Sequence, residues 1–344
     1  MRCVRLPRHG PPDVFVDAEE DTPLAGPGEL VVRVRAAGVN FADVLQRLGL
    51  YANAPKPPYV MGFEVAGEVE RVGDGVEGFA VGDRAVGMLH GGGYAGYARL
   101  PSRAALRLPP SIPDVAAAAL PVNYLTAWFC LFDMGALRSG EKVLIQGGAG
   151  GVGTAAIQLA RQAGATIFAT AGSEEKIEFL RRAGVEYPIR YDSVDFREPI
   201  RAVAGKRGLD LVLDGVGGET LRRGYELLAP LGRLVSYGLS DAVSGPRRSL
   251  LRIARAWWNT PRFHPLELIG RNVGVWGFHL ALLRGREERI AAALHEIVSR
   301  VETGRIEPVI AATFPLTARG AADAHRFLHE RRNIGKVLLV DEGA

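Results

Sequence analysis

The sequence predicts an α/β protein that combines a β-rich domain with a doubly wound parallel sheet. Three observations predict this class. Short apolar runs broken by Gly and Pro fill residues 1 to about 120. From residue 141 onward, apolar strands and helices alternate, and a glycine-rich turn, GGAGGVG, stands between the first strand and helix of that part. The first pattern is typical of compact barrel-like domains, and the other two are typical of parallel sheets with helical crossovers.

The β-rich part contains several strands separated by turn residues. ELVVRVRAAGV, residues 29–39, predicts a strand because its apolar residues partly alternate. EVAGEVERVGDGV, residues 64–76, predicts two short strands around a glycine turn, and residues 95–101 predict a strand that ends at a proline. Residues 113–135 then predict a helix, with Asp114 as its cap and Gly135 as its stop.

The alternating part continues nearly to the end of the chain. Predicted strands cover residues 141–147, 165–171, 209–216, 232–238, 271–279, 308–316 and 335–341. Predicted helices cover residues 152–164, 174–184, 219–230, 286–303 and 317–331. Continuous apolar strands joined by helices indicate a parallel sheet that is buried on both faces.

Composition limits the class of protein. The 344 residues are 47% hydrophobic, which allows a substantial core and two domains. Two cysteines cannot form a disulfide framework or a four-cysteine zinc site, and we see no secretory h-region or apolar run of membrane length, so we expect a cytoplasmic protein. The net charge of +4 is spread along the chain and does not indicate a nucleic-acid binder.

The glycine-rich turn has the spacing of a dinucleotide-binding fingerprint. Gly148, Gly150 and Gly153 fit G-x-G-x-x-G between a buried strand and a helix. Glycines let the backbone approach a pyrophosphate, and a helix N-terminus offers unpaired N–H groups and a favourable dipole. A glycine turn without a ligand is the alternative, and the strand–helix context argues against it.

The end of the next strand predicts which dinucleotide binds. An enzyme that uses NAD places an acidic residue about 20 residues after the fingerprint, where this chain has Gly172 followed by Ser173. Lys176 lies one turn further on, and a hydroxyl with a cation suits a 2′-phosphate. Two glutamates at 174 and 175 weaken the pattern, although they can point away at a helix start. We therefore predict NADPH rather than NADH.

Four segments give the chain a resemblance to a known family. GVNFADVLQRLGLY, GFEVAGEVERVGDGVEGFAVGDRAVG, GGAGGVGTAAIQLA and NIGKVLLV resemble the zinc-free quinone oxidoreductase group of the medium-chain dehydrogenase/reductase superfamily. LPVNYLTAWFCLFDMGAL, SGPRRSLLRIARAWWNT and VWGFHLALL are most similar to the branch of the synaptic-vesicle amine-transport-like membrane protein.

The resemblance implies a fold and a partner. A GroES-like catalytic domain would comprise residues 1–122 and 266–344, and a Rossmann dinucleotide-binding domain would comprise residues 123–265. The cofactor would lie in the cleft. The protein would form a homodimer, as such families often do through the edge strand of the Rossmann sheet.

The resemblance also speaks against a metal. Asn40 and Phe63 stand where zinc-bearing relatives have a ligand Cys and a ligand His, and the four-cysteine structural loop is missing. His325 and His329 lie four residues apart on a predicted helix, but we see no third ligand and expect solvated helix residues.

Asn40 and Tyr51 are the catalytic candidates, because the resemblance places them beside the nicotinamide. Asn40 would orient the carboxamide or a substrate carbonyl, and Tyr51 would stack or donate a proton. In the alternative reading Asn40 or Asp43 caps the helix that follows and Tyr51 packs; we assign Asp43 to the fold.

The remaining candidates are cofactor-binding residues. With Asn40, the set is Asn123, Thr126, Gly150, Gly151, Val152, Gly153, Gly172, Ser173, Lys176, Tyr191, Tyr237, Gly238, Phe278, His279, Leu280, Asn333 and Lys336. By resemblance, Asn123 and Thr126 approach the nicotinamide and ribose, with helix packing as an equal alternative. Tyr191 flanks the adenine or its 2′-phosphate, Tyr237 and Gly238 border the adenosine, residues 278–280 meet the carboxamide, and Asn333 and Lys336 reach the phosphates. Asp214 we read as structural.

The segment RRSLLRIARAWW, residues 247–258, leaves three interpretations open. It would dock on its own protein or on a dimer partner, cover a substrate, or contact a membrane surface; we favour docking.

The predicted function is a metal-free, NADPH-dependent reductase that transfers hydride to a quinone or an α,β-unsaturated carbonyl. Its small-molecule substrate is not defined by the sequence. One alternative is a specialised enoyl or alkenal reductase of a biosynthetic pathway. An alternative of another class is a membrane- or lipid-associated cofactor-binding protein with little turnover.

Overall fold

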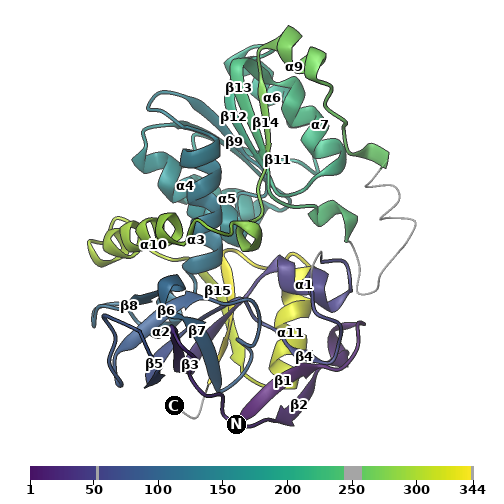
Figure 1. Cartoon of the computed structure of the whole chain (residues 1–344). Coiled ribbons are helices and arrows are strands. Elements are labelled where there is room, and N and C mark those ends of the chain that lie inside the picture. The colour runs from purple at the N-terminus through teal and green to yellow at the C-terminus, as the bar shows by residue number, and fades with distance from the viewer. Residues whose placement is uncertain (52–53, 244–257, 342–344) are drawn as a thin grey trace. The chain divides into compact units, whose positions relative to one another are not determined.

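The computed structural model of the chain describes residues 1–51, 54–243 and 258–341. These residues divide into two compact units (Figure 1). Of the described residues, the first unit contains Met1–Leu125 and residues 281–341, and the second contains those between them. The predicted segment 247–258 lies outside the described residues except for Trp258, whose side chain is exposed.

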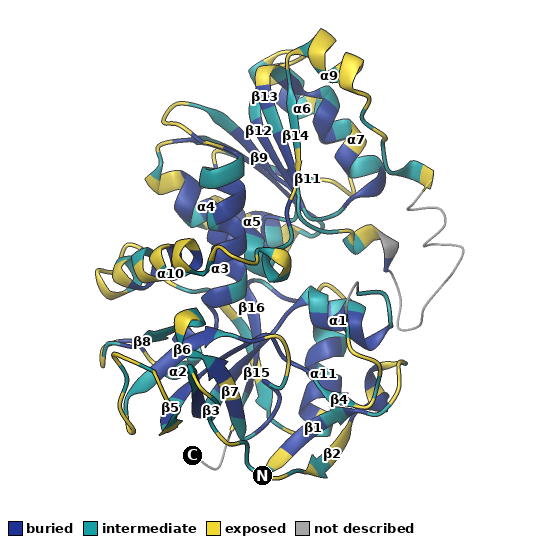
Figure 2. Ribbon diagram, viewed as in Figure 1, coloured by how far each residue is buried: buried dark blue, intermediate teal, exposed yellow. Residues whose placement is uncertain are grey.

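A six-stranded parallel sheet forms the centre of the second unit. Its strands follow the order β11-β10-β9-β12-β13-β14, and every neighbouring pair is parallel. They are β9 (Lys142–Ile145), β10 (Thr166–Ala171), β11 (Tyr187–Arg190), β12 (Leu209–Asp214), β13 (Leu228–Ser236) and β14 (Gly274–Gly277). The inner strands are almost wholly buried (Figure 2), as continuous apolar runs in a sheet covered on both faces should be.

Helices cover both faces of this sheet. They are α4 (Gly151–Gln162), α5 (Glu174–Arg182), α6 (Arg197–Ala204), α7 (Gly218–Glu226) and α9 (Pro265–Arg271), with a 3₁₀ turn η4 (Ser240–Ala242). Figure 1 shows α4 on one face, with α6 and α7 on the other. Small residues such as Ala155 and Ala156 are buried in α4, so that helix packs closely on β9 and β10.

Strand β14 places the end of the second unit further along the chain than the sequence analysis predicted. We expected the second domain to end at residue 265, yet residues 266–280 belong to the second unit. The physical reason is that β14 pairs with β13, where Leu234 faces Val275, and so extends the parallel sheet by one strand. The other boundary falls after Leu125 rather than after residue 122.

Two mixed or antiparallel sheets form the first unit. One has the order β2-β1-β4, from β1 (Arg2–Leu6), β2 (Val16–Glu19) and β4 (Tyr59–Val60). The other has the order β15-β16-β3-β5-β6-β8, with β7 also paired to β3. Its strands are β3 (Glu29–Val39), β5 (Glu64–Val72), β6 (Arg84–Met88), β7 (Tyr97–Pro101), β8 (Ala105–Arg107), β15 (Ile310–Pro315) and β16 (Lys336–Val340). Because β5 is one continuous strand, the prediction of two short strands over residues 64–76 is wrong.

The helices of the first unit pack around these sheets. They are α1 (Phe41–Arg47), α2 (Asp114–Ala117), α10 (Glu287–Glu302) and α11 (Ala318–His329), with short 3₁₀ turns η1 (Pro12–Val14), η2 (Ser102–Ala104) and η5 (Leu280–Leu282). Helix α11 contacts α1, η1, β15 and β16, and this packing carries His325 into the interior.

The predicted helix over residues 113–135 is interrupted. After α2, the chain restarts as α3 (Pro121–Trp128) and continues as a π-helix η3 (Phe129–Met134). Proline suits the first helical position, where its missing N–H would have no partner. Contrary to our expectation, the stretch Asp114–Met134 has the length and mean hydropathy, 1.6, of a membrane span, but 72% of its apolar window is buried within the structure.

Candidate active site

The turn after β9 holds the glycines of the fingerprint in close contact. Gly147 adopts a φ of +67°, and a Cβ on Gly153 would lie only 2.4 Å from the carbonyl oxygen of Gly147. The first helical bond of α4 runs from the Thr154 N–H to the Gly150 carbonyl at 2.8 Å. The N–H groups of Gly151, Val152 and Gly153 precede that bond and have no partner within the helix. They form the kind of helix N-terminus that binds phosphate.

A polar cluster forms where β10 ends. A Cβ on Gly172 would lie 2.4 Å from the Tyr191 hydroxyl, so the lack of a side chain admits that tyrosine. Ser173 caps α5, its hydroxyl accepting from the Lys176 N–H at 3.4 Å. Glu174 is engaged by Arg181 at 3.3 Å and Arg190 at 3.5 Å. The structure thus places Gly172, Ser173 and Tyr191 together at the end of β10, with the Lys176 backbone in the first turn of α5. Arg190, which we did not single out, lies beside them on Glu174.

A third group of residues, which includes Asp214 and Tyr237, lies where β12 and β13 end. Asp214 Oδ1 accepts from the N–H groups of Val216 at 2.8 Å and Gly217 at 2.6 Å, while burial raises the pKa of this carboxyl to about 6. Asp214 therefore shapes the loop, as we read it. A Cβ on Gly215 would lie 2.7 Å from the Tyr237 ring, so this ring packs against the same loop.

The segment after β14, residues 278–280, packs against other parts of the second unit. The Phe278 N–H donates to the Ser236 carbonyl at 2.9 Å, and the Phe278 ring stacks on Phe129 with centroids 5.7 Å apart. His279 is half-buried, and burial lowers its pKa. The predicted residues Thr126, Gly238 and Leu280 belong to this unit too.

In the first unit, Asn40 belongs to a buried ionic cluster. Asn40 Nδ2 donates to Glu64 Oε1 at 2.7 Å, and Lys336 Nζ donates both to Asn40 Oδ1 at 2.5 Å and to Glu64 Oε1. Glu64 Oε2 accepts from the Val122 N–H at 2.7 Å, at the start of α3. Glu64 and Lys336 are 0% and 3% exposed. The cluster fixes the Asn40 amide, because a lysine only donates and the carboxylate accepts.

Gly38 makes room for this cluster. A Cβ at Gly38, in β3, would lie 2.2 Å from Glu64 Oε1. The carboxylate of β5 therefore occupies the space beside β3 that any other residue would fill.

Tyr51 and Asp43 lie near Asn40. The Asp43 carboxylate accepts from the Asn40 N–H at 2.8 Å, so it supports the start of α1 as expected. Burial raises the pKa of Asp43 to about 7, against the opposing effects of the Asn40 hydrogen bond and the Lys336 charge. The Tyr51 ring packs on Phe63 with centroids 5.5 Å apart, and burial, aided by the charge of Asp43, raises its pKa to about 12. Tyr51 is therefore protonated at neutral pH.

The prediction that His325 is solvated is wrong. Its side chain is fully buried because α11 packs on the sheet. Arg47 Nε donates to His325 Nδ1 at 3.3 Å, and an arginine cannot accept, so the ring proton lies on Nε2, 3.3 Å from the Tyr94 hydroxyl. Burial and the charge of Arg47 hold the pKa of His325 well below its usual value. A guanidinium, and not a metal, thus occupies the place beside the histidine pair.

Comparison with known proteins identifies the family. The description "Alcohol dehydrogenase GroES-like domain" matches residues 26–110, and "Zinc-binding dehydrogenase" matches residues 151–292. The synaptic vesicle membrane protein VAT-1 homolog of Rattus norvegicus is 40% identical over 343 residues, which cover 99% of this chain and 84% of the rat protein. The chain belongs to the medium-chain dehydrogenase/reductase superfamily.

Solved structures of this superfamily agree with the fold. The Escherichia coli quinone oxidoreductase complexed with NADPH has a TM-score of 0.87 and 28% identity, over 99% of this chain and 100% of that one. The CurK enoyl reductase has a TM-score of 0.84 and 27% identity, over 99% of each chain. The chain is therefore an oxidoreductase of the medium-chain dehydrogenase/reductase type, with a GroES-like domain and a Rossmann-like parallel sheet.

Zinc is implied by the description of the superfamily model, but the cluster around Asn40 does not fit it. A zinc site needs three or four protein ligands with lone pairs to donate. Here the oxygens of Asn40 and Glu64 converge on the ammonium of Lys336, which has no lone pair to offer. Across residues 1–51, 54–243 and 258–341, no three His, Cys, Asp or Glu side chains gather in a way that could hold a metal.

The cluster also changes the roles expected near the C-terminus. We predicted that Asn333 and Lys336 reach the cofactor phosphates. Instead the Lys336 ammonium is buried on Asn40 and Glu64, and the Asn333 amide donates to the Gly335 carbonyl at 2.9 Å. Asn123 is buried one residue beyond Val122 in α3.

Sequence reasoning missed Glu64, the centre of the cluster. The segment GFE, residues 62–64, was considered only because Phe63 stands where zinc-bearing relatives have a ligand His. A signal was available: a glutamate at the start of an apolar strand has to be paired if that strand is buried.

Proposed function

We propose that this chain is an NADPH-dependent reductase that passes hydride to a conjugated carbonyl, either a quinone or an α,β-unsaturated aldehyde, ketone or thioester, without a metal. The observation that carries the cofactor assignment is the end of β10, where Gly172, Ser173, Lys176 and Tyr191 gather and Glu174 is engaged by two arginines. A glycine instead of an acidic residue at the strand end removes the carboxylate that would repel a 2′-phosphate. The NADPH complex of the related quinone oxidoreductase supports this assignment.

Loops of the second unit would hold most of the cofactor. The N–H groups of Gly151, Val152 and Gly153 would bind the pyrophosphate, and Ser173, Lys176 and Tyr191 the 2′-phosphate. Tyr237 and Gly238 would border the adenosine. Thr126, Asn123 and residues 278–280 would orient the nicotinamide. When bound, NADPH supplies the hydride to the carbon conjugated with the carbonyl.

Asn40 would stabilise the oxyanion that forms as hydride arrives. One amide hydrogen of Asn40 is used by Glu64, and Lys336 donates to the amide oxygen, which makes the remaining hydrogen a stronger donor. Tyr51 would donate a second hydrogen bond through its protonated hydroxyl. We assign no side chain as the obligatory acid, so water would supply the proton that completes the product.

Cofactor titration tests the first part of the proposal. We expect the chain to bind NADPH more tightly than NADH, and Lys176→Gln to weaken NADPH binding about tenfold while changing NADH binding little, because one charge-assisted contact is lost. Arg182→Gln, on the same helix, is the matched control. Tighter binding of NADH than of NADPH by the wild type would contradict the assignment.

A substrate panel tests the second part. NADPH oxidation would be followed with quinones, enals, enones and enoyl thioesters. The similarity to an enoyl reductase favours a second candidate, a specialised enoyl reductase, which would turn over the thioester and leave quinones unreduced. Replacing Asn40 with Ala should lower kcat more than it raises KM in either case.

We also propose a homodimer formed through β14. This strand is the edge of the parallel sheet, and the side chains of Trp276, Leu231 and Ile269 are 49%, 80% and 69% exposed. An open edge beside exposed apolar side chains can pair with a second copy. Light scattering during gel filtration should give twice the chain mass, and Val275→Pro, which removes an edge N–H, should give a monomer.

A further inference from the structure

A basic pocket lies in the second unit, away from the dinucleotide loop. It is lined by Arg201, Lys206, Arg207, Glu226 and Arg271. These residues precede β12, β13 and β14, and so stand at the amino ends of parallel strands. The glycine loop follows the carboxyl end of β9. The pocket and the dinucleotide loop therefore lie at opposite ends of the sheet.

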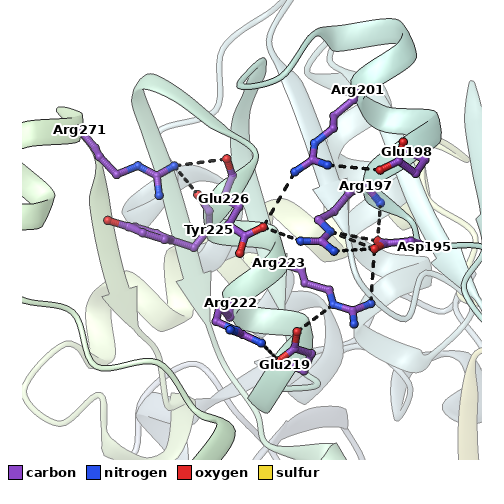
Figure 3. Close-up of polar contacts among 10 residues, drawn as sticks. All are labelled: Asp195, Arg197, Glu198, Arg201, Glu219, Arg222, Arg223, Tyr225, Glu226 and Arg271. Carbon is purple, nitrogen blue, oxygen red and sulfur yellow. Dashed lines mark hydrogen bonds and ion pairs between the residues drawn. The ribbon is translucent and has the colours of Figure 1, made fainter.

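Positive charge dominates the pocket. Four cationic side chains and one carboxylate line the pocket, and one of the four, Arg201, is also paired with Glu198 at 3.3 Å. That carboxylate, Glu226, is already used: Arg197 binds it at 2.6 Å and Arg201 approaches it at 4.0 Å (Figure 3). Arg207 and Arg271 donate to backbone carbonyls instead, at 3.0 Å to Leu228 and 2.9 Å to Tyr225. Their charges are thus held in place without being neutralised by those bonds.

The two arginines that flank Glu226 keep unused donors. Arg271 lies over the Tyr225 ring, 4.2 Å from its centroid, which fixes its guanidinium as Figure 3 shows. In the part of the chain that the structure describes, the buried Nε atoms of Arg201 and Arg271 have no hydrogen-bond partner. Because these Nε atoms are buried, a ligand would bind the two arginines through their terminal nitrogens.

The pocket has the size of a small-ligand site. Its volume is about 340 Å³, at the lower end of the range of ligand pockets. Phosphoryl groups suit it better than carboxylates, because each offers up to three terminal oxygens to the planar fork of an arginine.

We propose that this pocket binds a small molecule carrying a diphosphate group, at a site separate from the dinucleotide loop. Arg271 and Arg201 would each donate to one phosphoryl group from fixed positions. Lys206, at the open side, and Arg207 would add charge. The bound anion would tie the ends of α6 and α9 together and so hold the edge strand β14 against the sheet. This inference does not depend on the reductase proposal.

Calorimetric titration of the full chain with inorganic pyrophosphate tests the site. Lys206 and Arg207 are both exposed, so a Lys206→Gln/Arg207→Gln variant should fold normally. We expect this variant to bind pyrophosphate at least about tenfold more weakly than the wild type, because two charge-assisted contacts are lost. A second variant, Arg271→Lys, keeps the charge but loses the fork, and should also weaken binding.

Two control variants locate the anion. Arg182→Gln removes an exposed cation from α5, which packs on β10 and β11 and not on the strands of the pocket, and should leave binding unchanged. Lys176→Gln alters the cluster near the dinucleotide loop and should also leave it unchanged. Binding that the double variant keeps in full, as it would if pyrophosphate bound to the N–H groups of Gly151, Val152 and Gly153 instead, would overturn the proposal. No detectable binding by the wild type, or equal weakening by Arg182→Gln, would overturn it too.

Discussion

The buried pair of Glu64 and Lys336 gives the sharpest prediction, because Glu64→Gln would leave an ammonium without its counterion. Lys336 is 3% exposed and cannot reach water without moving β16. The glutamine would keep one acceptor oxygen for three donors, those of Asn40, Lys336 and Val122. Removing one partner of a buried ion pair costs about 3–5 kcal/mol, so we expect a loss of unfolding free energy in that range.

A matched surface pair provides the control. Glu68 lies on the same strand and binds Arg35 of β3 at 3.3 Å, with side chains 38% and 25% exposed. Glu68→Gln should cost less than about 1 kcal/mol, because solvent screens such a pair. Glu64→Gln combined with Lys336→Met should cost less than Glu64→Gln alone, since the second change removes the unpaired charge.

The assay has to report on the first unit. The four tryptophans lie at positions 128, 257, 258 and 276, so none falls within residues 1–125 or 281–341, and tryptophan fluorescence would miss this unit. Urea unfolding followed by far-UV circular dichroism, with hydrogen exchange of β5 and β16, measures it directly. If Glu64→Gln and Glu68→Gln destabilise the protein equally, the buried pair does not have the role that we give it.

Three further predictions concern pH and the glycine loop. The pKa of Asp43 is raised from 3.8 to about 7, so the folded state keeps a proton that the unfolded state releases, and unfolding free energy falls as pH rises from 4 to 7. Asp43→Asn should remove this fall, up to about 4 kcal/mol at 1.4 kcal/mol per pKa unit, as urea titrations at pH 4.5 and 8 would show; equal slopes in both proteins would contradict it. The pKa of His325 is lowered, and Arg47, His329 and Tyr94 face it, so the unfolded state takes up a proton first and stability falls as pH drops below about 6.5. His325→Asn should flatten that part of the profile relative to the wild type, and an unchanged acid limb would refute the buried neutral imidazole. Gly153→Ala should destabilise the chain by about 1–3 kcal/mol and abolish cofactor binding, because its Cβ would meet the backbone of Gly147 at 2.4 Å. Gly150→Ala, whose Cβ would lie 3.3 Å from the same carbonyl, is the milder control in calorimetry and cofactor titration.

The fold was predictable where local pattern decides it. Two patterns are visible without knowledge of tertiary contacts: apolar strands that alternate with helices, and glycines at the spacing of a phosphate loop. Both predict a parallel sheet, and the structure has one. Strand β5 was divided wrongly, because a glycine within a strand looks like a turn when its partner strands are unknown. Strand β14 was assigned to the wrong domain for a similar reason: four residues rich in glycine do not show that they pair with β13.

The candidate site was predictable residue by residue, but not as an arrangement. Position and resemblance pointed to Asn40 and to Lys336 separately. Their contact joins residues 296 positions apart, and only the pairing of β16 with β3 brings them together. Burial of His325 likewise depends on what α11 packs against. Spacing along one helix could show that two histidines share a face, but not that the face turns inward.

The order in which the chain is synthesised gives the ionic cluster one more consequence. Residues of the second unit are contiguous in the described chain, so that unit can assemble while its own segment leaves the ribosome. The first unit cannot do so. Glu64 is made early, and its counterion arrives only with β16, after the whole second unit has been translated. Until then the carboxylate must remain exposed to water or be covered by a chaperone. Strand β16 therefore completes the folding of the first unit by supplying the partner of Glu64.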